Sequence, residues 1–271
     1  MLATGAGVET GMNAQRGDGR TRAGDDRVVA ALVEARLTGA VPPLGELDGD
    51  FDDALAVQIA VLQGLKTRGF RQSGWKVGLT SGASYDLMGA GFRPFGFVLA
   101  ERTFASGVVL SDRPKAGGAI EPELCLRMER PLYGANIPPA ECQAAVAEVR
   151  AAFEINETRV ALANQSRLVV ADGLTNWGLV LGGGVPPRAG LSESRVELFV
   201  NGRLETASPP QLVMDCPFLS LSRLCTALSK FGWGVDAGQH VLTGAFLKRG
   251  LDAPGVYRAA VADIGDVTLI L

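Results

Sequence analysis

The 271-residue sequence lacks several features that would assign a protein to a class at once. No segment approaches the roughly 18 consecutive apolar residues that a membrane-spanning helix needs. Its 26 basic and 29 acidic residues give a net charge of -3, and no basic run is interleaved with aromatic residues. The sequence therefore predicts neither a membrane protein nor a nucleic-acid-binding protein.

Cysteine and histidine are scarce as well. The cysteines are widely spaced, form no C-x-x-C pair and follow no secretory signal, which favours reduced packing residues and a cytoplasmic location. They are Cys125, Cys142, Cys216 and Cys225. His240 is the only histidine, and neither a G-x-S-x-G nor an H-E-x-x-H motif is present. A catalytic triad and a histidine-based zinc site therefore lack support, and we expect a structural or surface histidine.

The chain is 47% hydrophobic and 20% charged, which is enough for a sizeable core. Residues 1–25, rich in Gly, Arg and Asp, predict a disordered tail. Apolar residues at helical spacing predict two helices within an N-terminal region at 26–73. These residues are Val28, Val29, Leu32 and Val33, and then Leu55, Ile59, Leu62 and Leu65.

Residues 74–271 predict a β-rich core, because short β-rich runs such as "RVELFVNG" and "GDVTLIL" are separated by turns. Two further helices are expected within it, around 139–153 and near 218–231. Helices followed by strands with inserted helices indicate an α+β fold.

The segment "AIEPELCLRM" at 119–128 has the pattern of a strand. Its period of two places Glu121 and Glu123 on one face, and Pro122 predicts an edge position or a bulge. Two carboxylates on one side repel each other unless a cation or a shared proton lies between them, and Mg²⁺ is a common remedy. By pattern alone, however, a solvated strand face is the more frequent reason for E-x-E.

Other polar residues stand out less strongly. Glu154 in "FEINETR" is expected at the end of an apolar helix face, as a third carboxylate or as a partner of Arg159. Lys76 lies in a strand-like run, where its ammonium either reaches the surface or sits in a pocket. "VVADGLTNWGLVLGGG" is most simply a hairpin. In "HVLTGAF", Thr243 precedes a glycine at the end of an apolar strand.

Taken together, these segments resemble the 2-keto-4-pentenoate hydratase / 2-oxohex-3-enedioate (4-oxalocrotonate) decarboxylase family of the fumarylacetoacetate hydrolase superfamily. The resemblance runs from about residue 28 to 271. It rests on an ordered series of motifs, namely "DDALAVQ", "GWKVGLTS", "FGFVLAE", "EPELCLRM", "FEINETR", "ADGLTNWGLVLG" and "VLTG". It implies an N-terminal helical region followed by a mixed β-sandwich or barrel-like core.

The resemblance also implies a site. Mg²⁺ or Mn²⁺ would be bound by Glu121, Glu123 and Glu154, with Lys76 and Glu101 as catalytic residues. The positions implied for substrate binding are Leu99, Asp172, Thr175, Thr243 and Gly244. The chain departs from the family at Gly173, where Asn is common, and over 205–220, where relatives shape the substrate pocket.

By this resemblance the protein is a hydratase that adds water to a 2-hydroxy-2,4-dienoate in aromatic-compound breakdown. The alternatives are a 2-oxo-3-enedioate decarboxylase, a C–C bond hydrolase of acylpyruvate type, and a non-catalytic partner subunit. A second cationic group for a distal carboxylate would favour the decarboxylase, and Arg93 is the candidate. The family further implies a homo-oligomer, with association to a sister pathway enzyme as an additional partner.

Overall fold

A computed structural model describes residues 25–160 and 165–271, so nearly all of the predicted tail lies outside the described residues. The helices are α1 Asp25–Thr38, α2 Phe51–Thr67, α3 Pro139–Ala144, α4 Ser166–Ala171 and α5 Pro217–Ser229. Among these described helices, none combines the length and the apolarity needed to cross a bilayer.

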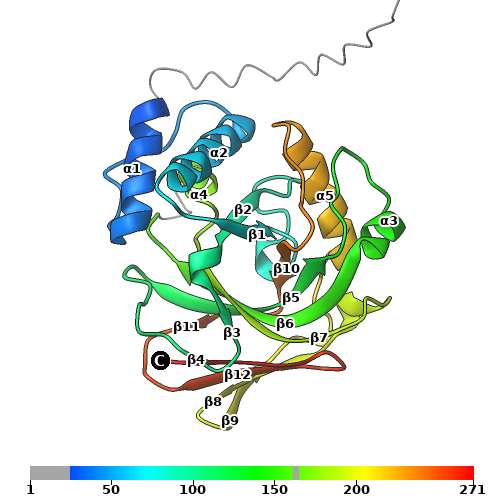
Figure 1. Cartoon of the computed structure of the whole chain (residues 1–271). Coiled ribbons are helices and arrows are strands. Elements are labelled where there is room, and N and C mark those ends of the chain that lie inside the picture. Colours follow the sequence, from blue (N-terminus) through cyan, green and yellow to red (C-terminus); the bar gives the residue numbers. More distant parts are fainter. Residues whose placement is uncertain (1–24, 161–164) are drawn as a thin grey trace, which may run out of the picture.

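The strands form two sheets (Figure 1). The larger has eight strands in the order β2-β1-β10-β5-β6-β7-β3, with β11 pairing with β5. Its strands are β1 Gln72–Val77, β2 Phe95–Leu99, β3 Thr103–Ala105, β5 Gly118–Met128, β6 Val146–Glu157, β7 Asn176–Val185, β10 His240–Ala245 and β11 Arg249–Gly250. Parallel and antiparallel pairs both occur in this sheet, which confirms the predicted α+β class with a mixed sheet.

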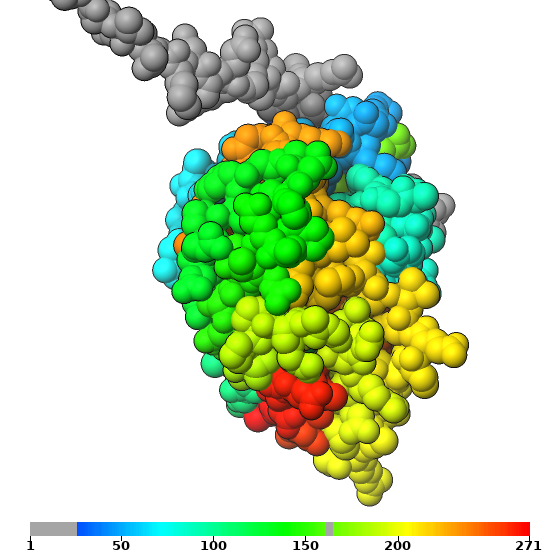
Figure 2. Space-filling model, turned by 90° about the vertical axis from the view of Figure 1, so that its right-hand side faces the viewer, coloured from blue at the N-terminus to red at the C-terminus, as the bar shows by residue number. Residues whose placement is uncertain are grey.

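The smaller sheet has five strands in the order β4-β13-β12-β8-β9. They are β4 Val108–Val109, β8 Val196–Val200, β9 Arg203–Ala207, β12 Val256–Val261 and β13 Gly265–Ile270. This sheet packs through β13 against β6 and β7, on the side of the larger sheet away from α1 and α2 (Figure 1). The molecule is elongated, and the end formed by β8 and β9 projects below the remainder (Figure 2).

The N-terminal helices form where the apolar spacing predicts them. Asp50 and Asp53 make a capping box that begins α2, and the buried face of α2 includes Leu55, Ile59 and Leu62. This face packs against α1 and α4, and its side chains share one continuous apolar core with the larger sheet.

Strand β5 lies in the middle of the larger sheet, between β10 and β6, so the predicted edge position of Pro122 is wrong and the predicted bulge is confirmed. The carbonyl of Pro122 accepts a hydrogen bond from the N–H of Phe246 at 3.0 Å. The pairing of β10 with β5 shifts register between Leu242 and Ala245. The proline therefore faces an irregular stretch of ladder, where its missing N–H costs little.

The predicted helix around 139–153 is wrong beyond its first turns. Only α3 is helical, and from Val146 onward the chain is strand β6. Because β6 is covered on both faces, residues 151–157 are all buried and the alternation typical of a half-exposed strand is lost. Val146, Val149 and Phe153 are three and four residues apart, which is the spacing of one face of a helix and explains the wrong prediction.

The predicted hairpin over residues 169–184 is also wrong, because its first half is helix α4. The valines of α4 favour a strand locally, but α4 buries Val169 and Val170 against α2. The side chain of Gln58 in α2 donates to the carbonyl of Val170 at 2.6 Å. Tertiary packing therefore overrides local propensity in this segment. The predicted helix near 218–231 is confirmed as α5.

Candidate active site

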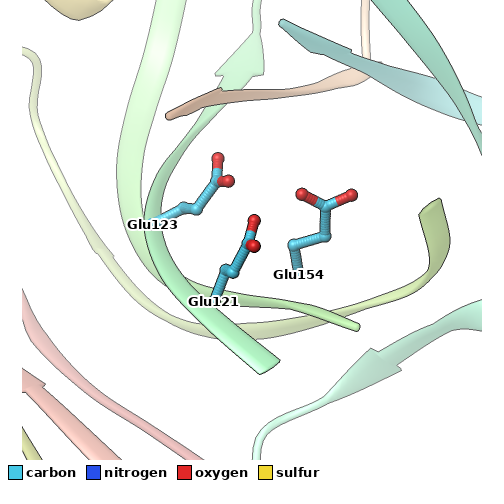
Figure 3. Close-up of side chains that lie close together, drawn as sticks. All are labelled: Glu121, Glu123 and Glu154. Carbon is cyan, nitrogen blue, oxygen red and sulfur yellow. The ribbon is translucent and has the colours of Figure 1, made fainter. Parts of the chain in front are cut away.

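Three glutamates converge on one face of the larger sheet (Figure 3). Glu121 and Glu123 alternate along β5, and Glu154 on β6 lies directly opposite Glu121 in the ladder. One carboxylate oxygen from each lies within 4.8 Å of the others. The expectation that Glu121 and Glu123 point the same way is confirmed, whereas Glu154 stands on a strand and not at the end of a helix.

Two of these carboxylates are held away from water. Glu123 and Glu154 are 2% and 0% exposed. Burial and the neighbouring charge of Glu154 raise the pKa of Glu123 well above its ordinary value, and burial likewise raises the pKa of Glu154. Carboxylates so placed are costly as anions unless a cation joins them.

Lys76 supplies one cation from β1. Its Nζ lies 2.6 and 2.8 Å from the two carboxylate oxygens of Glu154 and donates to the carbonyl of Leu174 at 3.0 Å. Burial alone lowers the pKa of Lys76, but the glutamates outweigh burial, and the pKa ends above its ordinary value. We call Glu121, Glu123, Glu154 and Lys76 the carboxylate cluster.

The cluster fits a divalent cation. Oxygen-only ligands suit Mg²⁺, Mn²⁺ and Ca²⁺, and three carboxylates against one buried lysine leave negative charge uncompensated. The ligands are also oriented by neighbours. The backbone N–H of Gly244 donates to Glu123 at 2.9 Å, and Asn176 Nδ2 donates to Glu154 at 2.9 Å. Such outer hydrogen bonds fix the direction of metal ligands.

A cavity of about 250 Å³ adjoins the carboxylate cluster. Of the residues predicted for the site, Lys76, the three glutamates, Thr175 and Gly244 line this cavity. Leu99, Glu101, Asp172 and Thr243 are not among its lining residues. The structure thus brings together the predicted metal ligands and one of the two predicted catalytic residues.

Glu101 is placed elsewhere within this chain. It lies in the short 3₁₀ turn Ala100–Arg102 and accepts hydrogen bonds from the backbone N–H and the guanidinium of Arg71. Partial burial raises its pKa, but these donors outweigh burial and leave the pKa below its ordinary value. A carboxylate in this state suits an ion pair better than proton transfer near neutral pH.

Leu99 and Thr243 have packing roles in the structure. Leu99 is buried in β2 beside β1. The Thr243 hydroxyl donates to the carbonyl of Leu124 at 3.1 Å, and the Thr243 carbonyl accepts from Thr80. These contacts tie β10 to β5 and to the loop after β1.

Asp172 belongs to a second buried group of charges. Arg159 Nη2 donates to Asp172 at 2.9 Å, and Arg159 also contacts Glu157. Arg36 of α1 donates to the backbone carbonyl of Asp172 and, at 3.0 Å, to that of Asn176. All four side chains are at most 5% exposed. We call Arg36, Glu157, Arg159 and Asp172 the arginine cluster.

The turn 173–176 lies between the two clusters. Gly173, Leu174 and Thr175 have φ values of 75°, 54° and 62°, three consecutive left-handed residues that are unusual outside glycine. The turn makes three contacts toward the cavity: the Leu174 carbonyl to Lys76, the Thr175 hydroxyl to Asn156 at 2.7 Å, and Asn176 to Glu154. Arg36 and Arg159 thus hold the element that orients the cavity residues.

Sequence reasoning missed Asn156 and Lys248, which also line the cavity. Asn156 follows Glu154 by two residues, a spacing that places both side chains on one face of a strand. The predicted helix in this segment concealed that relation. Lys248 Nζ lies 2.9 Å from Glu121, with 55% of its side chain exposed. Arg93 is not a lining residue, because it is sealed in ion pairs with Asp86 and Asp215.

Curated proteins related to this chain match along nearly its whole length. A 4-oxalocrotonate decarboxylase of Pseudomonas sp is 27% identical over 248 residues, which cover 89% of this chain and 96% of the relative. A 2-keto-4-pentenoate hydratase of Burkholderia vietnamiensis (strain G4 / LMG 22486) is 26% identical over 254 residues, or 90% of this chain and 97% of the relative. No family model matches the chain.

Solved structures share the fold. The 4-oxalocrotonate decarboxylase from Pseudomonas putida G7, complexed with magnesium and adipate, has a TM-score of 0.81 at 24% identity and covers 93% of this chain and 99% of its own. Fumarylpyruvate hydrolase from Pseudomonas aeruginosa, in complex with Mn²⁺ and pyruvate, has a TM-score of 0.54 at 17% identity, with coverage of 74% and 88%.

The relatives are enzymes, and both solved structures are named with a divalent metal. The resemblance that the sequence motifs indicated is confirmed: the chain is a homologue of 4-oxalocrotonate decarboxylases and 2-keto-4-pentenoate hydratases, built on the fold of the fumarylacetoacetate hydrolase superfamily.

Proposed function

We propose that the chain is a metal-dependent hydratase that adds water to a 2-hydroxy-2,4-dienoate such as 2-hydroxypenta-2,4-dienoate, giving a 4-hydroxy-2-oxo acid. One observation carries the choice of substrate. Every charged residue of the cavity lining is either in the carboxylate cluster or is Lys248, which pairs with Glu121. The other described walls are uncharged, so the cavity suits a ligand with one charged end.

Mg²⁺ or Mn²⁺ is the proposed cofactor, with Glu121, Glu123 and Glu154 as its ligands. When bound, the ion supplies Lewis-acid stabilisation of negative charge on the substrate's C2 oxygen. The related magnesium and manganese complexes support this choice.

Lys76 is the proposed proton carrier. Lys76 lines the cavity and its Nζ is hydrogen-bonded to Glu154, so a proton held at Nζ lies next to the position proposed for the substrate's 2-oxo acid group. A positioned acid or base of this kind contributes roughly 10²- to 10⁴-fold in rate. Thr175 and Gly244, which also line the cavity, are proposed to contact the substrate.

Decarboxylation of a 2-oxo-3-enedioate is the second candidate. It is supported by the named decarboxylase relatives and by Lys248, the one cation of the described lining that lies outside the carboxylate cluster. Half-exposed at the cavity wall, Lys248 could receive a distal carboxylate. Arg93, the candidate suggested by the sequence, is occupied by Asp86 and Asp215.

Turnover of 2-hydroxypenta-2,4-dienoate and of 2-oxohex-3-enedioate, each with Mg²⁺ and with EDTA, tests these proposals. We expect magnesium-dependent loss of the dienol absorbance, and Lys248→Met should retain this activity within a few-fold. Release of CO₂ from the enedioate that Lys248→Met abolishes would establish the decarboxylase instead. Metal binding without turnover of either substrate would favour a non-catalytic partner subunit.

We also propose that the chain forms a homo-oligomer, as the family resemblance implies. Light scattering coupled to size-exclusion chromatography tests this, and a monomeric mass at micromolar concentration would contradict it. Cytoplasmic location and association with a sister pathway enzyme stay predictions from the sequence.

A further inference from the structure

Asn156 presents an unused hydrogen-bond donor at the cavity. The residue is 1% exposed and lines the cavity on β6, on the same face as Glu154. Its Nδ2 has no hydrogen-bond partner among the described residues. Buried polar atoms of folded proteins are nearly always paired, so an unpaired donor on a residue that lines a cavity points to a group that arrives with the ligand.

The orientation of this amide is fixed by its other end. Asn156 Oδ1 accepts a hydrogen bond from the Thr175 hydroxyl at 2.7 Å, and Thr175 belongs to the left-handed turn held by the arginine cluster. Because Oδ1 is occupied in this way, the NH₂ group is the end that remains free.

The position of Asn156 along β6 indicates which ligand oxygen it meets. Strands rise about 3.4 Å per residue, so Asn156 stands about 7 Å along β6 from Glu154. In the proposed hydratase, the carboxylate and C2 oxygen of the ligand lie at the three glutamates. The oxygen added to C4 is two carbons farther along the chain, and an amide one pleat beyond the glutamates can reach it.

We propose that Asn156 is a specificity-determining residue whose Nδ2 donates a hydrogen bond to the C4 oxygen of the ligand. This inference rests on the proposed hydratase function. It assigns to Asn156 the recognition of a 4-hydroxy-2-oxo acid over an otherwise identical acid that lacks the hydroxyl group. A site built to pair with a hydroxyl rejects the analogue without it, because its own polar group is then left unpaired.

Two ligands of equal chain length test the proposal by calorimetry in the presence of Mg²⁺: 4-hydroxy-2-oxopentanoate and 2-oxopentanoate. We expect the wild type to bind the hydroxylated acid about 10- to 100-fold more tightly. Asn156→Ala should bind both acids about equally, with its affinity for 2-oxopentanoate unchanged. Thr175→Val, which frees Oδ1, should lose part of the preference.

Thr158→Val is the matched control. Thr158 follows the end of β6 directly, two residues after Asn156, and lines the same cavity, but it is exposed, so water can replace any partner of its hydroxyl. This variant should keep the full preference for the hydroxylated acid. Thermal melting verifies that each variant folds, and Asn156→Leu replaces Asn156→Ala if the latter does not.

The outcomes separate the inference from the function. Binding of both acids with no preference by the wild type, or an unchanged preference in Asn156→Ala, overturns the role of Asn156 and leaves the hydratase intact. Binding of neither acid overturns the proposed function itself. If Asn156→Ala instead selectively weakens 2-oxoadipate, the residue serves a distal carboxylate and the C4 assignment is overturned.

Discussion

Two buried groups of charges both contact the segment 172–176, and they differ in charge balance. The difference indicates which group is suited to a catalytic role and which to a structural role. The arginine cluster contains two guanidinium groups and two carboxylates, and its charges balance. Burial lowers the pKa of Arg36, yet an arginine keeps its charge at neutral pH. The carboxylate cluster instead contains three carboxylates and one ammonium beside a cavity, and the exposed ammonium of Lys248 at Glu121 still leaves negative charge in excess.

Burial alone therefore does not distinguish the two clusters, whereas charge balance and an adjoining cavity do. A balanced buried group stabilises contacts between elements, here α1 with the turn that precedes β7 and the segment after β6 with the end of α4. An unbalanced group needs an additional cation or a shared proton, and a place for an additional cation is what a metal site requires.

Replacing a ligand of the carboxylate cluster should give the largest effect on activity. For Glu123→Gln we expect kcat/KM to fall about a thousandfold, since the lost metal contact is worth several kcal/mol in the transition state. Calorimetry should show Mg²⁺ binding lost as well. The metal-free variant should be no less stable than the wild type, because one buried like charge is removed.

Glu148→Gln is the control for this variant. Glu148 also lies on β6 but pairs with Arg127 and Arg150 outside the cavity lining. Its replacement should leave Mg²⁺ binding unchanged. Activity of Glu123→Gln that survives EDTA would refute the metal site.

Breaking the arginine cluster should instead reduce stability. Arg159→Met leaves Glu157 and Asp172 buried without their shared cation, and removal of one member of a buried pair costs about 3–5 kcal/mol. Urea unfolding measures this loss. Arg68→Met, which breaks the exposed pair with Glu34, should cost at most about 1 kcal/mol. Equal losses in the two variants would show that the arginine cluster stabilises the fold no more than an exposed ion pair does.

A substitution in the turn should affect both clusters moderately. In Gly173→Ala the new Cβ would lie 2.4 Å from Arg36 Nη2, at a φ of 75° that itself costs an L-residue about 1–2 kcal/mol. We expect lower stability, by urea unfolding, and a several-fold lower kcat, because Leu174 and Asn176 carry the contacts to Lys76 and Glu154.

Gly190→Ala isolates the backbone contribution to that effect. Gly190 has the same φ of 75°, but a Cβ there would meet no atom within 4 Å. It should lose stability by the backbone cost alone and keep kcat unchanged. If both glycine variants keep full kcat, the turn does not position the cavity residues.

The smallest effect is expected at Lys248. Its pair with Glu121 is half-exposed, so Lys248→Met should change the free energy of unfolding by less than about 1 kcal/mol. Without the competing ammonium at Glu121, Mg²⁺ should bind a few-fold more tightly, an effect that shrinks in high salt. Calorimetry at two ionic strengths measures it, and weaker Mg²⁺ binding by the variant would be the contrary result. Lys230→Met, which breaks the exposed pair with Asp52, provides the control.

The sequence alone determined the features that depend on neighbouring residues. The pleat of β5 sets Glu121 and Glu123 on one face whatever pairs with the strand, because alternation is a property of the extended backbone. The apolar spacing of α2 likewise specified a helix and its buried face.

Only the tertiary structure decided which distant segments meet. Glu154 lies opposite Glu121 because β6 pairs with β5 in one register, and β6 itself was concealed by burial on both faces. Arg36, Asn156 and the turn 173–176 come from separate segments and meet only after folding. Backbone periodicity is local and can be read along the chain, whereas strand register and charge balance arise between segments and require the folded molecule.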